Sequence, residues 1–223
     1  MSTEAARDRL RDARRAVYRE AILDAAERAF AEASYQAARV QEIAAEAGVS
    51  LATFYATFPK KLDLYRGIHA RRLEALMLVI ARDQAAEANV LERLVAGVRS
   101  YLTFLMEHPS YLRMHLQERI AWTSTEGLRS PEQANAWRTG LEMMVAAIEH
   151  GIEAGYFIDD DPELIARTLI GMHQVRLALW IERGQQEPAA DVARAAVRQL
   201  VRCFCPPTRV DEFLALCGEA TEG

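Results

Sequence analysis

Few of the features that mark a secreted or membrane-spanning protein occur in this chain. It has three cysteines among 223 residues, and an odd number of thiols near one end does not make a disulfide framework. It has no run of about 18 to 20 apolar residues, the length that a membrane helix requires. Its first residues, rich in arginine and aspartate, contain no apolar signal core. We therefore expect a cytoplasmic protein with reduced thiols and no membrane partner.

Motifs of catalysis and metal binding are also missing. There is no nucleophile elbow, no phosphate-binding loop and no dinucleotide fingerprint. The five histidines form no His-Glu-x-x-His arrangement, and Cys203 with Cys205 lack partners at zinc-finger spacing. The sequence therefore predicts neither an enzyme nor a site for a metal or a cofactor.

Alternating strand patterns are absent as well, whereas the helix formers Ala, Arg, Glu and Leu dominate throughout. Apolar residues recur at helical spacing in most segments, which predicts an all-α fold. The expected helices run over about residues 14–33, 40–47, 51–57, 62–82, 87–107, 109–121, 131–154, 162–183 and 190–204.

The most informative segment, residues 40–61, reads VQEIAAEAGVSLATFYATFPKK. Gly48 follows a short amphipathic helix and suits the left-handed conformation just past a helix C-terminus. Ser50 is a natural N-cap for a second short helix, which would bury Phe54 and Phe58. Two short helices around a tight turn are the layout of a helix-turn-helix DNA reader, whose second helix enters a major groove.

The net charge of −5 is divided unevenly, with +1 over residues 1–66 and −6 over residues 67–223. Ahead of the first strongly periodic helix lie six arginines: Arg7, Arg9, Arg11, Arg14, Arg15 and Arg19. Such an arm can neutralise phosphates or reach a minor groove. Because acidic residues are interleaved with these arginines, a solvated extension of the helix is an equal alternative.

Two apolar helical faces near the C-terminus predict a homodimer, because two such helices per chain can make a four-helix interface with a symmetry mate. The alternative is an ordinary monomer core. The interface candidates are Leu164, Thr168, Met172, Val175, Leu179, Val192, Ala196, Gln199 and Leu200.

Methionine and aromatic residues are frequent in the C-terminal part of the chain. Methionine and tryptophan can line an adaptable apolar pocket in which a few polar groups orient a ligand, although at helical spacing such residues are more often core. The pocket candidates are Phe104, His108, Tyr111, Met114, His115, Trp122, Trp137, Met144, Met172 and His173. We expect a small, largely apolar or aromatic effector.

The segments AILDAAERAF, SYQAARVQEIAAEAGVS and LATFYATFPKKLDL resemble the DNA-binding domain of the TetR family of bacterial transcriptional regulators. They cover about a fifth of the chain, and the order of AGVS, a Thr-aromatic-Tyr triplet, Phe, Pro, Lys and Leu is specific. The resemblance implies a three-helix DNA-binding domain and a larger helical domain for effector binding and dimerisation. We place these at residues 1–60, with the basic arm, and at residues 61–223.

Some positions depart from the family's pattern. Ser34 stands where glycine is common, so a positive φ there would carry a cost. Arg39 stands where a threonine often precedes the second helix, so capping by a hydroxyl is lost there. Leu51 and Ala52 replace the frequent Lys and Gly, and Thr57 replaces His. The reading face is therefore less cationic than is usual in the family.

Residue chemistry and the resemblance together give the DNA-binding candidates. Leu51 and the Thr53 methyl favour contacts with thymine methyls. Tyr55, Thr57 and Lys61 match positions that the family uses for phosphates. The candidate set is Arg39, Gln41, Ser50, Leu51, Ala52, Thr53, Tyr55, Thr57 and Lys61.

The predicted function is that of a homodimeric repressor that binds double-stranded DNA at a palindromic operator. A small effector would release it from DNA by favouring one distance between the two recognition helices of the dimer. The long helix that begins near Lys61 would transmit this change. The alternative is a constitutive DNA- or protein-binding scaffold of the same fold with no effector.

Overall fold

The computed structural model of the protein describes residues 3–117 and 131–218. Within these ranges the regular elements are all helices, as the sequence predicts, and none of them is long and apolar enough to cross a membrane. The chain forms two compact units, Met1–Arg72 with Ser110–Glu118 and Leu73–Pro109 with Arg119–Gly223. The first unit therefore extends past the predicted limit at residue 60.

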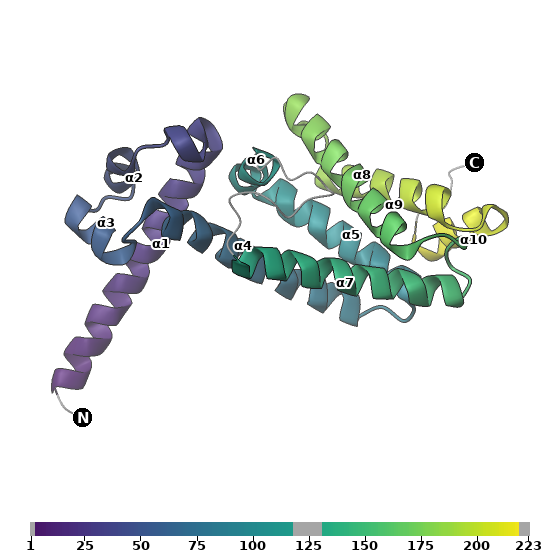
Figure 1. The fold of residues 1–223 in the computed structure, drawn as a ribbon, viewed down its shortest axis with the longest axis horizontal. Helices are drawn as coiled ribbons and strands as arrows, with labels where there is room; N and C mark the ends of the chain where they lie inside the picture. The colour runs from purple at the N-terminus through teal and green to yellow at the C-terminus, as the bar shows by residue number, and fades with distance from the viewer. Residues whose placement is uncertain (1–2, 118–130, 219–223) are drawn as a thin grey trace. The chain divides into compact units, whose positions relative to one another are not determined.

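The N-terminal unit is built around a long first helix. Its elements are α1 (Thr3–Ala37), α2 (Val40–Glu46), α3 (Leu51–Thr57), the first half of α4 (Lys61–Ala85) and α6 (Pro109–Gln117) (Figure 1). Helix α1 packs against α2 and α3 and buries Ile22, Ala25, Ala26 and Phe30 completely. It begins at Thr3 rather than near residue 14, because the arginine-rich arm is itself helical.

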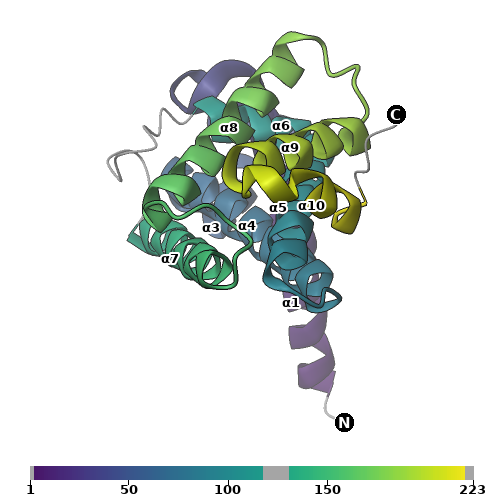
Figure 2. The same ribbon diagram turned by 90° about the vertical axis from the view of Figure 1, so that its right-hand side faces the viewer.

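The C-terminal unit contains the second half of α4 and most of the remaining helices. These are α5 (Val90–Glu107), α7 (Pro131–Glu153), α8 (Pro162–Glu182), α9 (Ala189–Phe204), the 3-10 helix η1 (Pro207–Arg209) and α10 (Val210–Leu216). Helix α5 packs mainly on α9, and α7 packs mainly on α8 (Figure 2). None of the three cysteines, which lie in or after α9, forms a disulfide.

Local sequence signals explain several helix starts in this unit. Asn89 caps α5 in a capping box with Glu92, since each side chain bonds the other residue's backbone amide. Asp161 accepts hydrogen bonds from the amides of Glu163 and Leu164 at the start of α8, and a proline occupies the first turn. Helix α10 was not predicted, because it is short and, unlike α3, has no capping side chain to mark its start.

Candidate nucleic-acid interface

The turn between α2 and α3 has the hydrogen bonds of a Schellman motif. Gly48 lies in the left-handed region with φ 67°. Its amide donates to the Ala45 carbonyl over 3.1 Å, and the Val49 amide donates to the Ala44 carbonyl over 3.0 Å. Carbonyls that would be left unpaired at the end of α2 are thereby satisfied. The predicted role of Gly48 is confirmed.

Ser50 caps the N-terminus of α3, as predicted from the sequence. Its hydroxyl oxygen accepts a hydrogen bond from the Thr53 amide over 3.1 Å and lies 2.9 Å from the Thr53 hydroxyl. Phe54 and Phe58 are buried in the core of the unit, which confirms their predicted packing role. The buried face of α3 is thus fixed, and the opposite face must point to solvent.

The exposed face of α3 is small and mostly apolar. Leu51 is 42% exposed and Tyr55 is 49% exposed, and Ala52 between them is exposed as well. Thr57 is half-buried, and its hydroxyl donates to the Thr53 carbonyl over 2.9 Å. Helix α3 contains no lysine or arginine. Such a face can contact thymine methyls and offer one phenol hydroxyl, but it contributes no positive charge.

Two further candidates, Arg39 and Gln41, are exposed at the start of α2. Arg39 occupies the N-cap position without any capping hydrogen bond from its side chain, as the departure from the family's pattern led us to expect. Its Nη1 atom lies 3.6 Å from Glu42 Oε1, and both side chains are largely in solvent. An exposed pair of this kind is weak enough for the guanidinium to turn to a phosphate.

Lys61 is tied to the end of α1. Its Nζ atom donates to the Gln36 carbonyl over 3.3 Å and to the Ala38 carbonyl over 2.5 Å, and it lies 4.9 Å from the centre of the Tyr35 ring. Partial burial lowers the pKa of Lys61. The ammonium group therefore holds the turn after α1, and a phosphate would have to share it with these two carbonyls.

That turn contains a strained backbone position. Ser34 has φ 69° and ψ 163°, a combination that glycine adopts readily and other residues adopt at a cost. The resemblance had indicated that a positive φ at this residue would carry a cost. The last turn of α1 is therefore redirected at Ser34, and the Ala38 amide is bonded to the Ser34 carbonyl over 3.1 Å.

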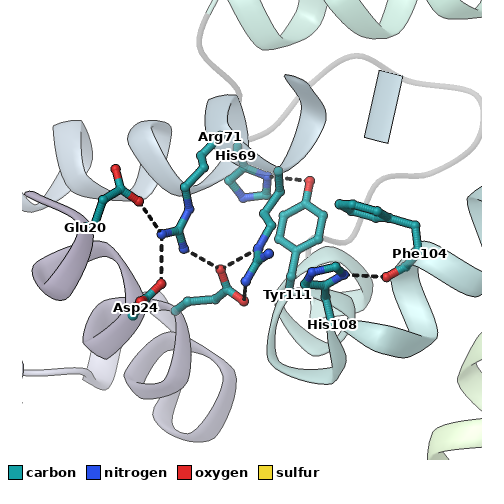
Figure 3. Close-up of polar contacts among 9 residues, drawn as sticks. Glu20, Asp24, His69, Arg71, Phe104, His108 and Tyr111 are labelled. Carbon is teal, nitrogen blue, oxygen red and sulfur yellow. Dashed lines mark hydrogen bonds and ion pairs between the residues drawn. The ribbon is translucent and has the colours of Figure 1, made fainter. Parts of the chain in front are cut away.

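An ionic cluster joins α1 to α4, and the sequence analysis did not anticipate it (Figure 3). Arg71 Nη1 donates to Glu20 over 2.9 Å and to Asp24 over 2.8 Å. Glu27, only 4% exposed, accepts hydrogen bonds of 2.9 to 3.1 Å from both Arg71 and Arg72. Although partial burial alone would lower the pKa of Arg71, hydrogen bonds and the surrounding carboxylates raise it. The one signal of this cluster in the sequence was the spacing of Glu20, Asp24 and Glu27, which places three carboxylates on one face of α1.

A run of aromatic rings crosses the same unit from α1 to α6. Neighbouring ring centres are 4.6 to 5.7 Å apart along Phe30, Tyr35, Tyr65, His69 and Tyr111. The Tyr111 hydroxyl lies 3.4 Å from His69 Nδ1, as Figure 3 shows. Gln117 Nε2 adds a hydrogen bond of 3.2 Å to the Ala31 carbonyl. Helix α6 is therefore held to the rest of the N-terminal unit at both of its ends.

The residues predicted to line a ligand pocket are divided between the two units. Tyr111, Met114 and His115 lie on α6 in the N-terminal unit, and Trp122 lies outside the described residues. The C-terminal unit contains the rest, namely Phe104, His108, Trp137, Met144, Met172 and His173. His108 Nδ1 donates to the Phe104 carbonyl over 2.7 Å. The pocket assignment stays a prediction.

A buried polar group on α5 and α8 stands out in the C-terminal unit. Gln174 Nε2 donates to the Tyr101 hydroxyl over 3.2 Å, and the His173 and Tyr101 ring centres are 6.3 Å apart. His173 is 4% exposed, and its Nε2 atom has no hydrogen-bond partner among the described residues. Burial, reinforced by the positive charge of Arg176, lowers the pKa of His173 to about 4. The imidazole is therefore neutral at pH 7.

An open groove of about 650 Å³ lies between α8 and α9. It is lined in part by Thr168, Met172, Val175, Leu179, Val192 and Gln199, all of them predicted dimer residues. Leu164, Val175 and Leu179 are exposed on α8, and a Cβ added at Gly171 would meet no other atom. Val192, although it lines the groove, is buried in the core of the unit, as are Ala196 and Leu200, so these three have almost no surface left for a partner.

Comparison with known proteins agrees with this arrangement of helices. The family described as "Bacterial regulatory proteins, tetR family" matches residues 22–68, and the family described as "Tetracyclin repressor-like, C-terminal domain" matches residues 87–204. A curated relative, the HTH-type transcriptional activator FasR of Mycolicibacterium smegmatis, is 34% identical over 89 residues. That match covers 40% of this chain and 40% of FasR.

Solved structures of similar fold cover most of the chain. The ketosteroid transcriptional regulator KstR2 of Mycobacterium tuberculosis has a TM-score of 0.72 at 23% identity, over 84% of this chain and 95% of KstR2. FadR of Bacillus subtilis, solved in complex with stearoyl-CoA, has a TM-score of 0.68 at 20% identity, over 81% of this chain and 96% of FadR. At these identities the likeness establishes the fold of the chain.

Proposed function

Because the chain belongs to the TetR family and is a DNA-binding transcriptional regulator, we propose that it acts as a homodimeric repressor at a palindromic operator. The observation that carries the proposal is the exposed face of α3, held outward by the Schellman turn and the Ser50 cap. In a two-fold dimer, two such faces about one DNA turn apart read inverted half-sites.

The chemistry of α3 indicates how it discriminates between bases. Leu51 and Ala52 are exposed, and neither can form a hydrogen bond with its side chain. Their contacts therefore favour the thymine methyl over the polar edge of a cytosine. Tyr55 carries the one phenol on this face and can donate to a phosphate or a base. We expect operator half-sites in which thymine occupies the positions next to Leu51.

Selection of bound fragments from random duplex DNA, repeated at two salt concentrations, tests the proposal. Recovery of a palindrome by the wild-type protein is the expected result, and Leu51→Gln should change the preferred sequence. Leu216→Gln is a matched control, because Leu216 on α10 is also 42% exposed and lies in the other unit. Salt-sensitive binding without sequence preference would instead favour a constitutive scaffold.

Helix α8 is the proposed centre of the dimer interface. Leu164, Thr168, Val175 and Leu179 follow one face of this helix, and three of them are large exposed hydrophobic residues. A stripe of this length is unusual on a protein that stays monomeric. Gly171, in the middle of the stripe, allows a partner helix to approach closely because no side chain stands in the way.

The effector is proposed to be largely apolar and to bind in the C-terminal unit, with a polar group near His173. A neutral imidazole with an unpaired ring nitrogen favours an uncharged hydrogen-bonding group such as a carbonyl or hydroxyl. The stearoyl-CoA bound by FadR combines such a carbonyl with a long apolar chain. Stearoyl-CoA is therefore the first probe to try.

The effector experiment measures release of the selected operator by stearoyl-CoA, with free coenzyme A as the control ligand. We expect release by the acyl compound and none by coenzyme A, and His173→Leu should weaken the response. His150→Leu is the matched control, since His150 is an exposed histidine on α7. Release by coenzyme A alone, or by highly charged metabolites alone, would contradict an apolar effector.

Repression and activation are separated by a reporter gene placed behind the selected operator. We expect transcription to rise when the gene for this protein is deleted. FasR is named an activator, so a fall in transcription on deletion is the informative opposite result.

Helix α4 belongs to both units, since its residues up to Arg72 lie in the first and those from Leu73 lie in the second. In the proposed mechanism, an effector that prefers one arrangement of α4 changes the distance between the α3 helices of the two chains.

A further inference from the structure

The exposed face of α3 lacks the positive charge that DNA binding needs, and several cations of the N-terminal unit are already engaged. Arg28 Nε is bound to Glu46 over 2.6 Å, and Lys61 is bound to two backbone carbonyls. Arg71 and Arg72 are committed to the cluster around Glu27. Arg39 can still turn to a phosphate, because its pair with Glu42 is exposed. Since neutralised phosphates supply most of the sequence-independent affinity for DNA, further cations beside it would add to the binding.

The first part of α1 carries an excess of such cations. Residues 7–19 include six arginines and two aspartates, a net charge of +4, and every residue from 7 to 20 is exposed. Arg11 lies 3.3 Å from Asp8. Among the side chains that the structure describes, Arg7, Arg14 and Arg15 form no ion pair. We call residues 3–19 the α1 extension, and Figures 1 and 2 show it projecting from the rest of the unit.

Four of these arginines share one face of the α1 extension. Arg7, Arg11, Arg14 and Arg15 are spaced by four, seven and eight residues from the first, which places them along one stripe of an α-helix. Eighteen residues make five helical turns, so Arg7 is in line with Ala25, which is buried in the three-helix core. The stripe therefore faces the same side as the helices that α1 packs against.

The base of the extension lies next to the end of the recognition helix. The Arg19 guanidinium lies 4.8 Å from the centre of the Phe58 ring, and Phe58 is the C-cap residue of α3. From this point the helix runs outward for about 25 Å, at 1.5 Å per residue. It can therefore follow the phosphates of up to about seven base pairs, at 3.4 Å each.

We propose that the α1 extension is a second DNA-binding surface, which contacts the phosphate backbone beside each operator half-site through Arg7, Arg11, Arg14 and Arg15. An α-helix about 10 to 12 Å across is too wide to enter a minor groove about 6 Å wide, so the helical form of the arm favours contact with the phosphates. The contact adds affinity without adding sequence preference. This inference rests on operator binding as proposed above.

The test compares two double variants in operator binding across a series of salt concentrations. Arg7→Gln with Arg14→Gln removes two stripe charges per chain, or four per dimer. The negative slope of log K against log salt should become shallower by about 3 to 4, at about 0.9 per phosphate contact. The control combines Arg9→Gln, on another face of the extension, with Arg202→Gln on α9. It changes net charge equally and should leave the slope near the wild-type value.

Three results would overturn the inference. Equal losses in the two double variants would show that only net charge matters, and an unchanged slope in the stripe variant would show that these arginines contact nothing. Leu10 and Val17, seven residues apart and exposed on the extension, suit contact with another protein helix. If deletion of residues 2–15 changes the number of chains in the assembly, as measured by sedimentation, the extension is a protein contact. Failure of the wild-type protein to select any palindrome would overturn the proposed function itself.

Discussion

Substitution of Glu27 by glutamine should destabilise the N-terminal unit much more than the same change at Glu20. The Glu27 carboxylate is 4% exposed and accepts three hydrogen bonds of 2.9 to 3.1 Å from Arg71 and Arg72. Removing one member of a buried ion pair costs about 3 to 5 kcal/mol. Both arginine side chains keep about a fifth of their surface exposed, so we expect about 2 to 3 kcal/mol here.

Glu20 provides the control because it makes one bond to the same arginine at the surface. Its side chain is 57% exposed, and loss of such a pair costs about 0 to 1 kcal/mol. Thermal unfolding followed by circular dichroism should show the melting temperature of Glu27→Gln lowered by about 5 to 10 °C, at about 2 to 4 °C per kcal/mol. Equal shifts for the two variants would refute the reasoning, since burial would then not matter.

Three further predictions concern other parts of the chain. Ser34→Gly should raise the free energy of unfolding by about 1 kcal/mol in urea titrations, because glycine tolerates φ 69°. Val175→Glu places a charge on the exposed stripe of α8 and should convert the dimer to monomers in sedimentation, whereas Val17→Glu should not. The pKa of His173 is about 4 in the folded protein, against an ordinary 6.5. The neutral imidazole therefore contributes about 3 kcal/mol to the free energy of unfolding above pH 6.5, and this contribution is lost as the pH falls towards 4. His173→Leu should flatten stability between pH 7 and pH 4.5.

The elements that follow from local chemistry were predictable from the sequence. The turn at Gly48, the cap at Ser50 and the burial of Phe54 and Phe58 depend on residues within a few positions of one another. The cost of a positive φ at Ser34 was indicated by the resemblance, because glycine is common at this position of the family. Short-range hydrogen bonding and helical periodicity determine all of these features, and both can be read along the chain.

Contacts between distant segments were not predictable in the same way. Glu27 and Arg72 are 45 residues apart, and the acidic spacing on α1 does not indicate which basic residues it meets. Ala196 and Leu200 are apolar residues at helical spacing, which suits an interface and a core equally well. Which of these alternatives holds depends on the packing of α9 against α5, a tertiary contact. The same limit applies to Tyr111, which the sequence placed in a ligand pocket and which contacts His69 of α4.

The position of the ionic cluster bears on how an effector signal would reach α3. The part of α4 that belongs to the N-terminal unit ends at Arg72, which is bound to Glu27. The first half of α4 is therefore clamped to α1 up to the boundary of the unit. Movement of the second half of α4 would be passed to α1 as a rigid rotation, because bending between the two helices would require breaking the cluster. Glu27→Gln should consequently weaken the effector response more than it weakens operator affinity in the absence of effector. Equal affinity for the operator with an undiminished response would place the path of coupling elsewhere, for example through α6 and its contact with His69.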